Sequence, residues 1–198
     1  MPSDEGMRDA VAVALAAHGD APGRVRLTAT PRPTLLVEVV PVEPLSAGPA
    51  TAGAVTVAGA WFPGNRMAEH KSLSYAAHRL SQRRAEEAGA DHALLLDVRR
   101  RLGEAALASV FCRVDGEVMT APVDGLLPGI ARGLGLAASG ARERAAEEAE
   151  WRGAQEIVVV NAVRGAMAVL ALDGSPVGDG RPGTLARELA DALRAAMT

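Results

Sequence analysis

The chain reads HKSLSYAAHRLSQRRAEEAGADHALLLD over residues 70–97, where its only lysine is followed by a helix-like and then a strand-like segment. Lys71 stands among 21 Lys and Arg side chains, and all the others are arginines. A lysine ammonium can lose its proton when it is partly desolvated and then act as a nucleophile, which a guanidinium cannot do. Lys71 is therefore a candidate for covalent catalysis, with retention by chance as the alternative.

The residues after Lys71 predict a helix over 72–90. One face of this helix carries apolar residues at helical spacing, namely Leu73, Ala76, Ala77 and Leu80. Gly89 is typical of a helix end. On this interpretation Lys71 lies at the N-terminal edge of the helix, and the apolar run 92–98 that follows is a strand.

The other segments also show helical or strand-like patterns. Helices are expected over 4–18, 129–138, 142–153 and 183–197. Further strands are expected over 24–30, 34–42, 54–59, 102–114, 117–123, 156–163 and 166–174, the first two as a hairpin. Because strands come in runs with helices between the runs, the sequence favours an α+β fold over a doubly wound sheet. The change in composition from residue 43 onward indicates a domain boundary near Asn65.

Composition and charge argue against several classes of function. A formal net charge of -3 and an aromatic content of 3% disfavour nucleic acid as a partner. The single Cys112 and an opening MPSDEG without a signal-like segment predict a cytoplasmic protein. Since no apolar run approaches the roughly 20 residues that span a bilayer, no membrane partner is expected. The histidines His70, His78 and His92 form no metal-ligand pattern with the cysteine, so no metal site is predicted.

Four segments, in this order and spacing, resemble the fold-type IV pyridoxal-phosphate enzymes, also called class IV aminotransferases. They are residues 70–97, LGEAALASVF (102–111), GLLPGIARGLGL (125–136) and EIVVVNAVRGAMAVLALDG (156–174). The resemblance implies the α+β fold of the D-amino acid aminotransferases. It also implies a shortened small N-terminal domain over residues 1–64 and a larger cofactor-binding domain over residues 65–198. Because relatives form dimers with the active site near the interface, a homodimer is expected.

The resemblance assigns chemical roles to two side chains. Lys71 would form the internal aldimine with pyridoxal 5'-phosphate and afterwards act as the base that moves protons at the substrate. Glu104 would pair with the pyridine nitrogen and keep it protonated. From its Gly and Ala neighbours alone, Glu104 would be interpreted as a solvated strand residue.

By the same resemblance, two segments would surround the cofactor phosphate. Their residues are Gly129, Ile130 and Ala131 at a helix start, and Asn161 and Ala162 in a turn. Relatives often carry hydroxyl residues at the positions of the two alanines, and an arginine upstream of this chain's first residue. The cofactor is therefore expected to be held weakly.

Four side chains are candidates for substrate binding, namely Arg26, Arg32, Tyr75 and Arg164. Arg26 and Arg164 face either the cofactor cleft or water, and Tyr75 either packs or faces the cofactor. Arg32 is the only basic residue in a shortened turn that replaces a loop which, in relatives, helps to bind the substrate carboxylate.

The pattern of Asn161, Arg164 and Gly165 is most similar to aminodeoxychorismate lyase, which releases 4-aminobenzoate and pyruvate. The resemblance therefore implies a pyridoxal-phosphate-dependent lyase or aminotransferase that acts on an aminodeoxychorismate-like or another small amino-acid substrate. The alternative is a shortened scaffold that binds another ligand or works without the cofactor. Missing phosphate contacts favour that alternative, whereas the retention of Lys71 and Glu104 argues against it.

Overall fold

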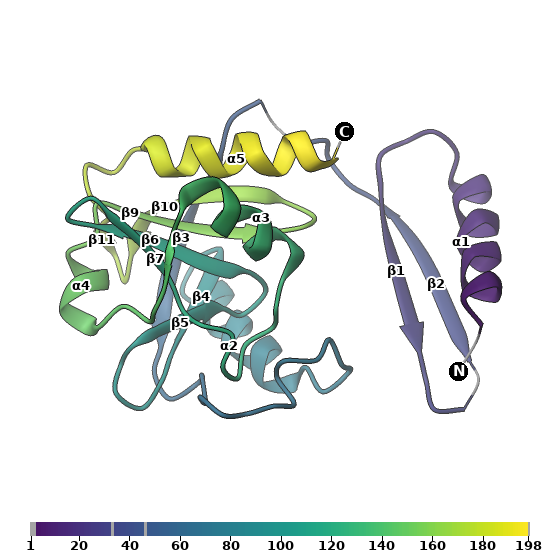
Figure 1. The fold of residues 1–198 in the computed structure, drawn as a ribbon, viewed down its shortest axis with the longest axis horizontal. Helices are drawn as coiled ribbons and strands as arrows, with labels where there is room; N and C mark the ends of the chain where they lie inside the picture. The colour runs from purple at the N-terminus through teal and green to yellow at the C-terminus, as the bar shows by residue number, and fades with distance from the viewer. Residues whose placement is uncertain (1–2, 33, 46, 198) are drawn as a thin grey trace. The chain divides into compact units, whose positions relative to one another are not determined.

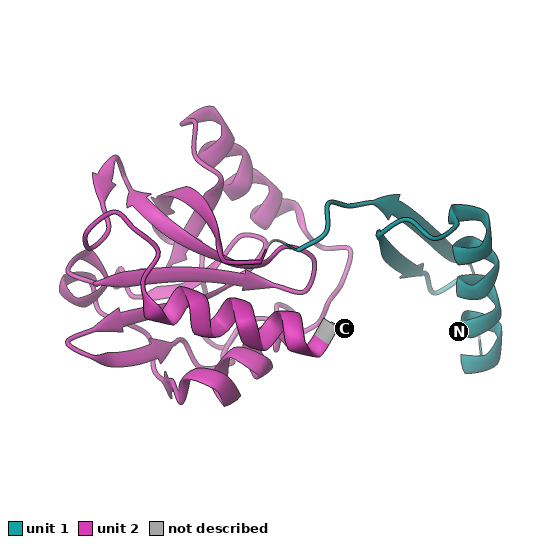
Figure 2. Cartoon of the chain, turned by 90° about the horizontal axis from the view of Figure 1, so that it is seen from above, with its two compact units in different colours: residues 1–45 teal, residues 46–198 magenta. Residues whose placement is uncertain are grey.

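The computed structural model describes residues 3–32, 34–45 and 47–197, and the chain forms two compact units. Unit 1 comprises residues 1–45 and unit 2 comprises residues 46–198 (Figure 2). Composition assigns the segment 47–64 to a small first domain, but its contacts place it in unit 2. The reason is strand β3, Ala50–Val57, which pairs with unit 2 strands on both of its edges.

Unit 1 consists of a helix packed along a two-stranded hairpin (Figure 1). Helix α1 spans Asp4–His18, strand β1 spans Gly23–Ala29 and strand β2 spans Leu35–Pro41. The Ser3 hydroxyl accepts a hydrogen bond from the Gly6 N–H and so caps the start of α1. The two strands pair antiparallel, with Val25 opposite Val39. The predicted helix over 4–18 and the predicted hairpin are both confirmed.

Unit 2 is built on a curled, mixed sheet of nine strands within the described chain (Figure 1). Besides β3, these are β4 (His92–Leu96), β5 (Leu102–Ala105), β6 (Ser109–Val114), β7 (Glu117–Thr120), β8 (Arg142–Glu143), β9 (Glu156–Asn161), β10 (Gly165–Leu172) and β11 (Ser175–Pro176). Their order is β5-β4-β3-β10-β9-β6-β7-β8, with β11 paired to β10. The sheet curls so far that Leu102, at one end of this order, pairs with Ala146, just beyond β8 at the other end.

Helices cover the outside of this sheet. They are α2 (Ala76–Glu87), α3 (Ile130–Ser139), α4 (Glu148–Arg152) and α5 (Thr184–Met197). Helices α3 and α5 pack against each other and against β9, and α5 also packs on β10, while α2 packs on β4 (Figure 1). Among the described residues, no helix is both long and apolar enough to cross a membrane.

Side chains alternate along the strands and so divide the core of unit 2 into layers. In β9, Ile157 and Val159 join an inner cluster that includes Leu94 and Leu96 of β4. The residues between them, including Val158, face outward against α3 and α5. A third cluster around Trp61, Ala85 and Leu95 lies beneath α2.

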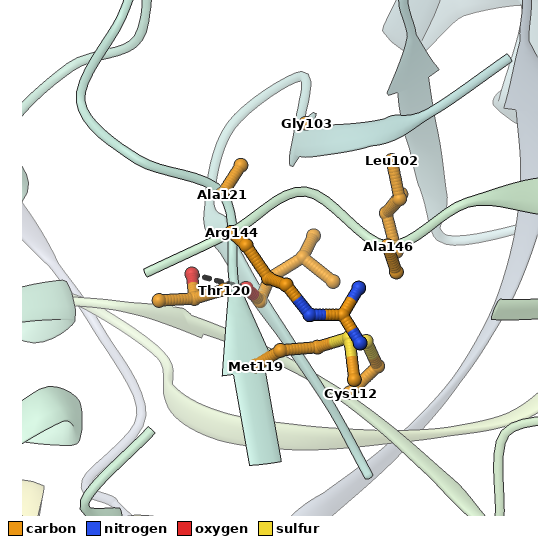
Figure 3. Close-up of a pocket in the computed structure, with 9 residues that line it drawn as sticks. Leu102, Gly103, Cys112, Met119, Thr120, Ala121, Arg144 and Ala146 are labelled. Atoms are coloured by element: carbon orange, nitrogen blue, oxygen red, sulfur yellow. Dashed lines mark hydrogen bonds between the residues drawn. The ribbon is translucent and has the colours of Figure 1, made fainter. Parts of the chain in front are cut away.

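The inside of the curled sheet is filled by side chains. Figure 3 shows part of the inner cluster, where Cys112 and Met119 lie close to the partly exposed Arg144. The gap that they line with six other residues has no room for a water molecule. The Thr120 hydroxyl is satisfied within this region by donating to the Val110 carbonyl at 2.7 Å. This part of the inner cluster is thus packed, and its gap is too small for a ligand.

Helix α2 begins later than the sequence predicts, so the placement of Lys71 at a helix edge is wrong. The Ser74 N–H donates to the Ser72 hydroxyl, and the Tyr75 N–H donates to the Leu73 carbonyl. Local bonds of this kind compete with helix formation. Lys71 therefore lies in a loop that precedes α2.

The apolar side of α2 is not the side that packs on the sheet. Leu73, just before the helix, and Leu80 are 63% and 62% exposed, whereas Ser81, Gln82 and Ala85 are buried. The Ser81 hydroxyl donates to the Ala77 carbonyl at 3.0 Å and the Gln82 amide N–H donates to the Asp91 carbonyl at 2.8 Å, while Gln82 Oε1 has no hydrogen-bond partner among the described residues. The helix thus leaves an apolar face exposed within this single chain.

Two further expectations about elements need correction. Residues 102–114 form two strands instead of one, because the Ala105 N–H donates to the Ala108 carbonyl at 2.8 Å and closes a turn between β5 and β6. The helix expected over 142–153 keeps only the five residues of α4. The first two residues of the predicted helix, Arg142 and Glu143, instead pair with β7 and form β8.

Candidate active site

The loop of residues 61–75, called here the Lys71 loop, is anchored to the segment that leads into α3. The Trp61 indole N–H donates to the Asp124 carbonyl at 2.9 Å, and the Gly64 N–H donates to the Asp124 carboxylate at 2.5 Å. The backbones also approach closely, because a Cβ on Gly125 would lie 2.3 Å from the Phe62 carbonyl oxygen. With its φ of 69°, this position suits glycine alone.

Lys71 is exposed and begins a line of side chains that runs into the core. Its Nζ lies 5.8 Å from the centroid of the Tyr75 ring. That ring stacks on His78, with centroids 5.5 Å apart and planes 18° from parallel. His78 Nε2 lies 3.2 Å from Glu104 Oε1. Lys71 and Glu104, which are far apart in sequence, are thus linked through two intervening rings.

Glu104 is a buried carboxyl group on β5, with 8% of its surface exposed. Burial raises its pKa, and the hydrogen bond and charge of His78 act in the opposite direction. Since ionisable groups are rarely buried without a charged or hydrogen-bonding partner, such a carboxyl is a candidate for function. The interpretation of Glu104 as a solvated strand residue is therefore wrong.

The N-terminus of α3 presents backbone donors next to the Lys71 loop's anchor. Gly129 is its N-cap, without a side-chain cap. The N–H groups of Ile130 and Ala131 have no hydrogen-bond partner within the described part of the chain. Such donors, together with the helix dipole, favour an anion. The Ser109 hydroxyl faces the same place, since its Oγ would lie 3.3 Å from a Cβ on Gly129.

Two residues of the first turn of α3 hold it in place. Ala131 is 3% exposed and packs into the outer cluster beneath α3 and α5. The Arg132 guanidinium donates to the Ala121 carbonyl and to the Glu143 carboxylate, both at 2.7 Å. A hydroxyl at position 131 would therefore enter the core, so its absence costs the anion site less than the sequence alone implies.

The predicted turn between β9 and β10 is organised by Asn161. Its side-chain oxygen accepts hydrogen bonds from the N–H groups of Val163 and Arg164 at 2.9 and 2.7 Å. Its side-chain N–H donates to the Leu107 carbonyl at 3.4 Å, which ties this turn to the one that follows Glu104. Ala162 and Arg164 are exposed.

Arg164 also lies near enough to influence His92. Burial lowers the pKa of His92, and the charge of Arg164 lowers it further. His92 is 2% exposed, and neither ring nitrogen has a hydrogen-bond partner among the described residues. Within the same residues, no group of three or more His, Cys, Asp or Glu side chains could hold a metal ion.

The structure brings most of the predicted unit 2 residues into one region. The turn after Glu104 leads to Ser109, which faces Gly129, and Asn161 bonds to that same turn. The two other candidates lie in unit 1, where Arg26 pairs with Glu38 at 3.9 Å and the Arg32 carbonyl accepts bonds inside the hairpin turn. Their roles in substrate binding stay predictions.

Sequence reasoning missed two residues of this region. In the sequence His78 is one of three histidines that form no metal-ligand pattern, although its spacing from Gln82 and Ala85 places all three on one side of a helix. Ser109 lies inside the segment LGEAALASVF and has no distinguishing sequence neighbour. Only the approach of β6 to the start of α3 identifies it.

Comparison with known proteins gives a family and a fold. The amino-transferase class IV profile matches residues 1–172. No curated protein matches the sequence. The T.th. branched-chain amino acid aminotransferase complexed with N-(5'-phosphopyridoxyl)-L-glutamate is similar, with a TM-score of 0.69 and 27% identity over 74% of this chain and 52% of that chain. The complex of this aminotransferase with 4-methylvaleric acid gives a TM-score of 0.72 and 26% identity over 84% and 57%.

A hypothetical aminotransferase from Mycobacterium tuberculosis, in its PLP-bound form, has a TM-score of 0.81 and 23% identity over 100% of this chain and 77% of that chain. At this identity the likeness shows the fold. The predicted α+β fold of the fold-type IV enzymes is thereby confirmed. The chain spans about half the length of the T.th. aminotransferase that it matches.

Proposed function

This chain belongs to the class IV aminotransferase family, and from that premise we propose that it binds pyridoxal 5'-phosphate and acts on a small amino-acid substrate. When bound, the cofactor supplies an aldehyde that takes up amino groups and a ring that accepts electron density from the bond broken at the substrate α-carbon. One observation carries the proposal. The Lys71 loop is bonded to the segment that leads into α3, and Tyr75 and His78 link Lys71 to the buried carboxyl group of Glu104.

The groups present fit the two ends of such a cofactor. Lys71 Nζ is the only lysine amine in the chain and is open to a ligand. It would attach to the aldehyde and, once displaced by substrate, would carry a proton at the substrate α-carbon. The Glu104 carboxylate would face the ring nitrogen and hold its proton.

The phosphate would be bound mainly by backbone. The N–H groups of Ile130 and Ala131 supply donors at the start of α3, with Gly129 allowing close approach. The turn of Asn161 and Ala162 lies near the turn that follows Glu104 and would approach the phosphate from there. Because Ala162 offers no hydroxyl, we expect weaker binding than in relatives that carry one.

For the reaction, we propose aminodeoxychorismate cleavage to 4-aminobenzoate and pyruvate, on the pattern of Asn161, Arg164 and Gly165. Arg164 is exposed beside the phosphate turn, and Tyr75 lies beside Lys71. Both would contact substrate. Transamination, as in the branched-chain aminotransferases to which the chain is similar, is the nearest alternative.

We further propose that the protein works as a homodimer in the cytoplasm. The exposed apolar residues Leu73 and Leu80 favour a covered surface beside the Lys71 loop. A scaffold that has lost the cofactor is the second candidate function, because the exposed Ala162 offers the phosphate no hydroxyl. The retained pair of Lys71 and Glu104 weighs against it.

Borohydride reduction tests the proposal directly. The protein incubated with pyridoxal 5'-phosphate is expected to show a visible absorption band that reduction removes, leaving a phosphopyridoxyl group on Lys71. Because Lys71 is the only lysine, mass spectrometry of the peptide separates this site from the α-amino group. Lys71→Arg keeps the charge and removes the nucleophile, so it should fold normally and show no band. An unmodified, colourless native protein would support the scaffold instead.

Product analysis separates the two reactions. A lyase acting on aminodeoxychorismate releases pyruvate with no keto-acid acceptor, whereas a transaminase needs an amino donor and an acceptor such as 2-oxoglutarate. We expect pyruvate in the absence of acceptor. If turnover requires the acceptor and releases no pyruvate, the protein is a transaminase and the proposed lyase reaction is wrong.

A further inference from the structure

The hydrogen bond between His78 and Glu104 joins a helix to the sheet at the candidate site. The His78 side chain is 25% exposed and that of Glu104 is 11% exposed, so the pair is largely shielded from water. Within the described chain, His78 is the only side chain that bonds to the Glu104 carboxylate. The orientation of this carboxylate therefore depends on one histidine ring.

The histidine ring is itself held in place. Tyr75 stacks on it nearly in parallel, and the Lys71 ammonium lies 5.8 Å from the centroid of the Tyr75 ring. The titratable groups along this line are thus Lys71, Tyr75 and His78, all from α2 and the segment before it. Burial and His78 are the influences that set the pKa of Glu104.

Stability alone is a poor explanation for this pair. Desolvating two ionisable groups costs free energy that their attraction often does not recover, and apolar residues of similar volume commonly replace such pairs without loss. The cluster beneath α2 is apolar and contains Trp61, Ala85 and Leu95. An apolar pair would suit this layer equally well, so the polar pair points to a role in the site.

We propose that His78 is a positioning residue of the cofactor site, which fixes the Glu104 carboxylate in one orientation and keeps it ionised to face the cofactor's ring nitrogen. The inference rests on the proposed function and adds a residue that acts through Glu104. Tyr75 supports His78 by stacking. His78 itself would touch neither the cofactor nor the substrate.

The first test uses the protein without cofactor. Carbon-13 NMR follows the titration of the glutamate carboxyl groups, and the Glu104 signal is identified by its loss in Glu104→Gln. In His78→Ala the Glu104 midpoint is expected at higher pH than in the native protein, because burial remains and the partner is gone. His78→Gln keeps an N–H donor and should shift the midpoint less. Arg79→Ala, an exposed neighbour on the same helix, should leave it in place.

The second test compares pyridoxal 5'-phosphate with an analogue in which carbon replaces the ring nitrogen. If His78 acts through Glu104 on that nitrogen, His78→Ala weakens binding of the cofactor by roughly tenfold and leaves the analogue's affinity unchanged. Equal losses for both ligands would mean a merely structural role and would overturn the inference. So would a Glu104 midpoint unchanged in His78→Ala.

Different results would contradict the proposed function and the role of His78. A native protein that binds no pyridoxal 5'-phosphate ends the proposed function and the inference with it, whatever the NMR result. A native protein that binds the cofactor while His78→Ala behaves as native ends the inference alone. Circular dichroism checks the fold of each variant, and if His78→Ala does not fold, His78→Gln is measured in both tests by the same criteria.

Discussion

Gly103, next to Glu104 in β5, is a position where a larger residue does not fit. A Cβ there would lie 2.6 Å from Cδ2 of Trp61. Trp61 is 3% exposed and held by its bond to the Asp124 carbonyl. This close approach fixes the backbone of β5 against the Lys71 loop, and so fixes where Glu104 lies.

Gly103→Ala is therefore expected to lower the free energy of unfolding by about 1 to 3 kcal/mol, as overpacking of a dense core does. Urea denaturation measures the change. Gly133→Ala is the matched control, because Gly133 lies inside α3 with nothing within 4 Å of a Cβ, and it should gain about 0.5 to 1 kcal/mol. Two similar small effects would show that the Trp61 ring moves aside at little cost.

The sequence predicts that Lys71 and Glu104 are functional residues, but it gives no such indication for His78. The difference has a physical reason. A single lysine among arginines and a motif glutamate are visible as residue types in a pattern. His78 matters through one contact across 26 positions, from α2 to β5, and through the stacking of Tyr75. Which carbonyl or carboxylate a histidine reaches depends on how far a helix is turned on its sheet, and periodicity alone does not give that rotation.

Strand β6 and helix α3 together form the candidate phosphate site. The Ser109 Oγ faces Gly129, and among the described residues it has no hydrogen-bond partner. The start of α3 adds the N–H groups of Ile130 and Ala131. With Ala131 directed into the core, Ser109 is the hydroxyl best placed to supplement these backbone donors.

Ser109→Ala is expected to weaken binding of pyridoxal 5'-phosphate by about threefold to tenfold, the effect of one net hydrogen bond. Affinity for pyridoxal without its phosphate should stay the same. Equilibrium titration with both compounds makes the comparison. Ser139→Ala, at the other end of α3, serves as the control, since its hydroxyl bonds only the Gly135 carbonyl within the described structure. An equal loss of affinity for both compounds would show that Ser109 does not contact the phosphate.

At the level of elements, local patterns predict most helices and strands, while pairing across the chain decides the remainder. The helix at 4–18 and the strands at 92–96 and 156–161 follow from cap residues and apolar runs. The helical pattern of 142–153 loses its first part because Arg142 and Glu143 pair beside β7. The parallel pairing of β3 with both β4 and β10 joins segments distant in sequence, so no local signal contains it.

The division into units also depends on long-range pairing. Residues 43–53 are rich in Pro, Gly, Ser and Ala and look like a surface connection, yet β3 begins at Ala50 inside that stretch. Its small residues suit a central strand, since Ala52 and Ala54 are buried in the inner cluster. The composition therefore agrees with a linker only up to the start of β3. From Ala50 onward, pairing in the sheet places the residues in unit 2.

Unit 2 exposes an apolar surface that a single chain does not cover. Leu73 and Leu80 lie on one side of α2 and the segment before it, with Ala76 and Ala77 between them, all exposed. Met67, earlier in the Lys71 loop, is 64% exposed. Apolar groups gathered beside a candidate site are typical of an interface. In line with the proposed homodimer, we expect a second copy of this chain to cover this surface.

Leu80→Glu is expected to convert the protein from a dimer to a monomer without unfolding it. The side chain is 62% exposed in the single chain, so the carboxylate stays in water there, whereas an interface would bury it without a partner. Sedimentation velocity at several protein concentrations measures the mass, and circular dichroism checks the fold. Val98→Glu, the same kind of change at a 79% exposed residue in the β4–β5 turn, should leave the dimer intact. A native protein that sediments as a monomer rules out the homodimer, and a Leu80→Glu protein that remains dimeric places the interface on another surface.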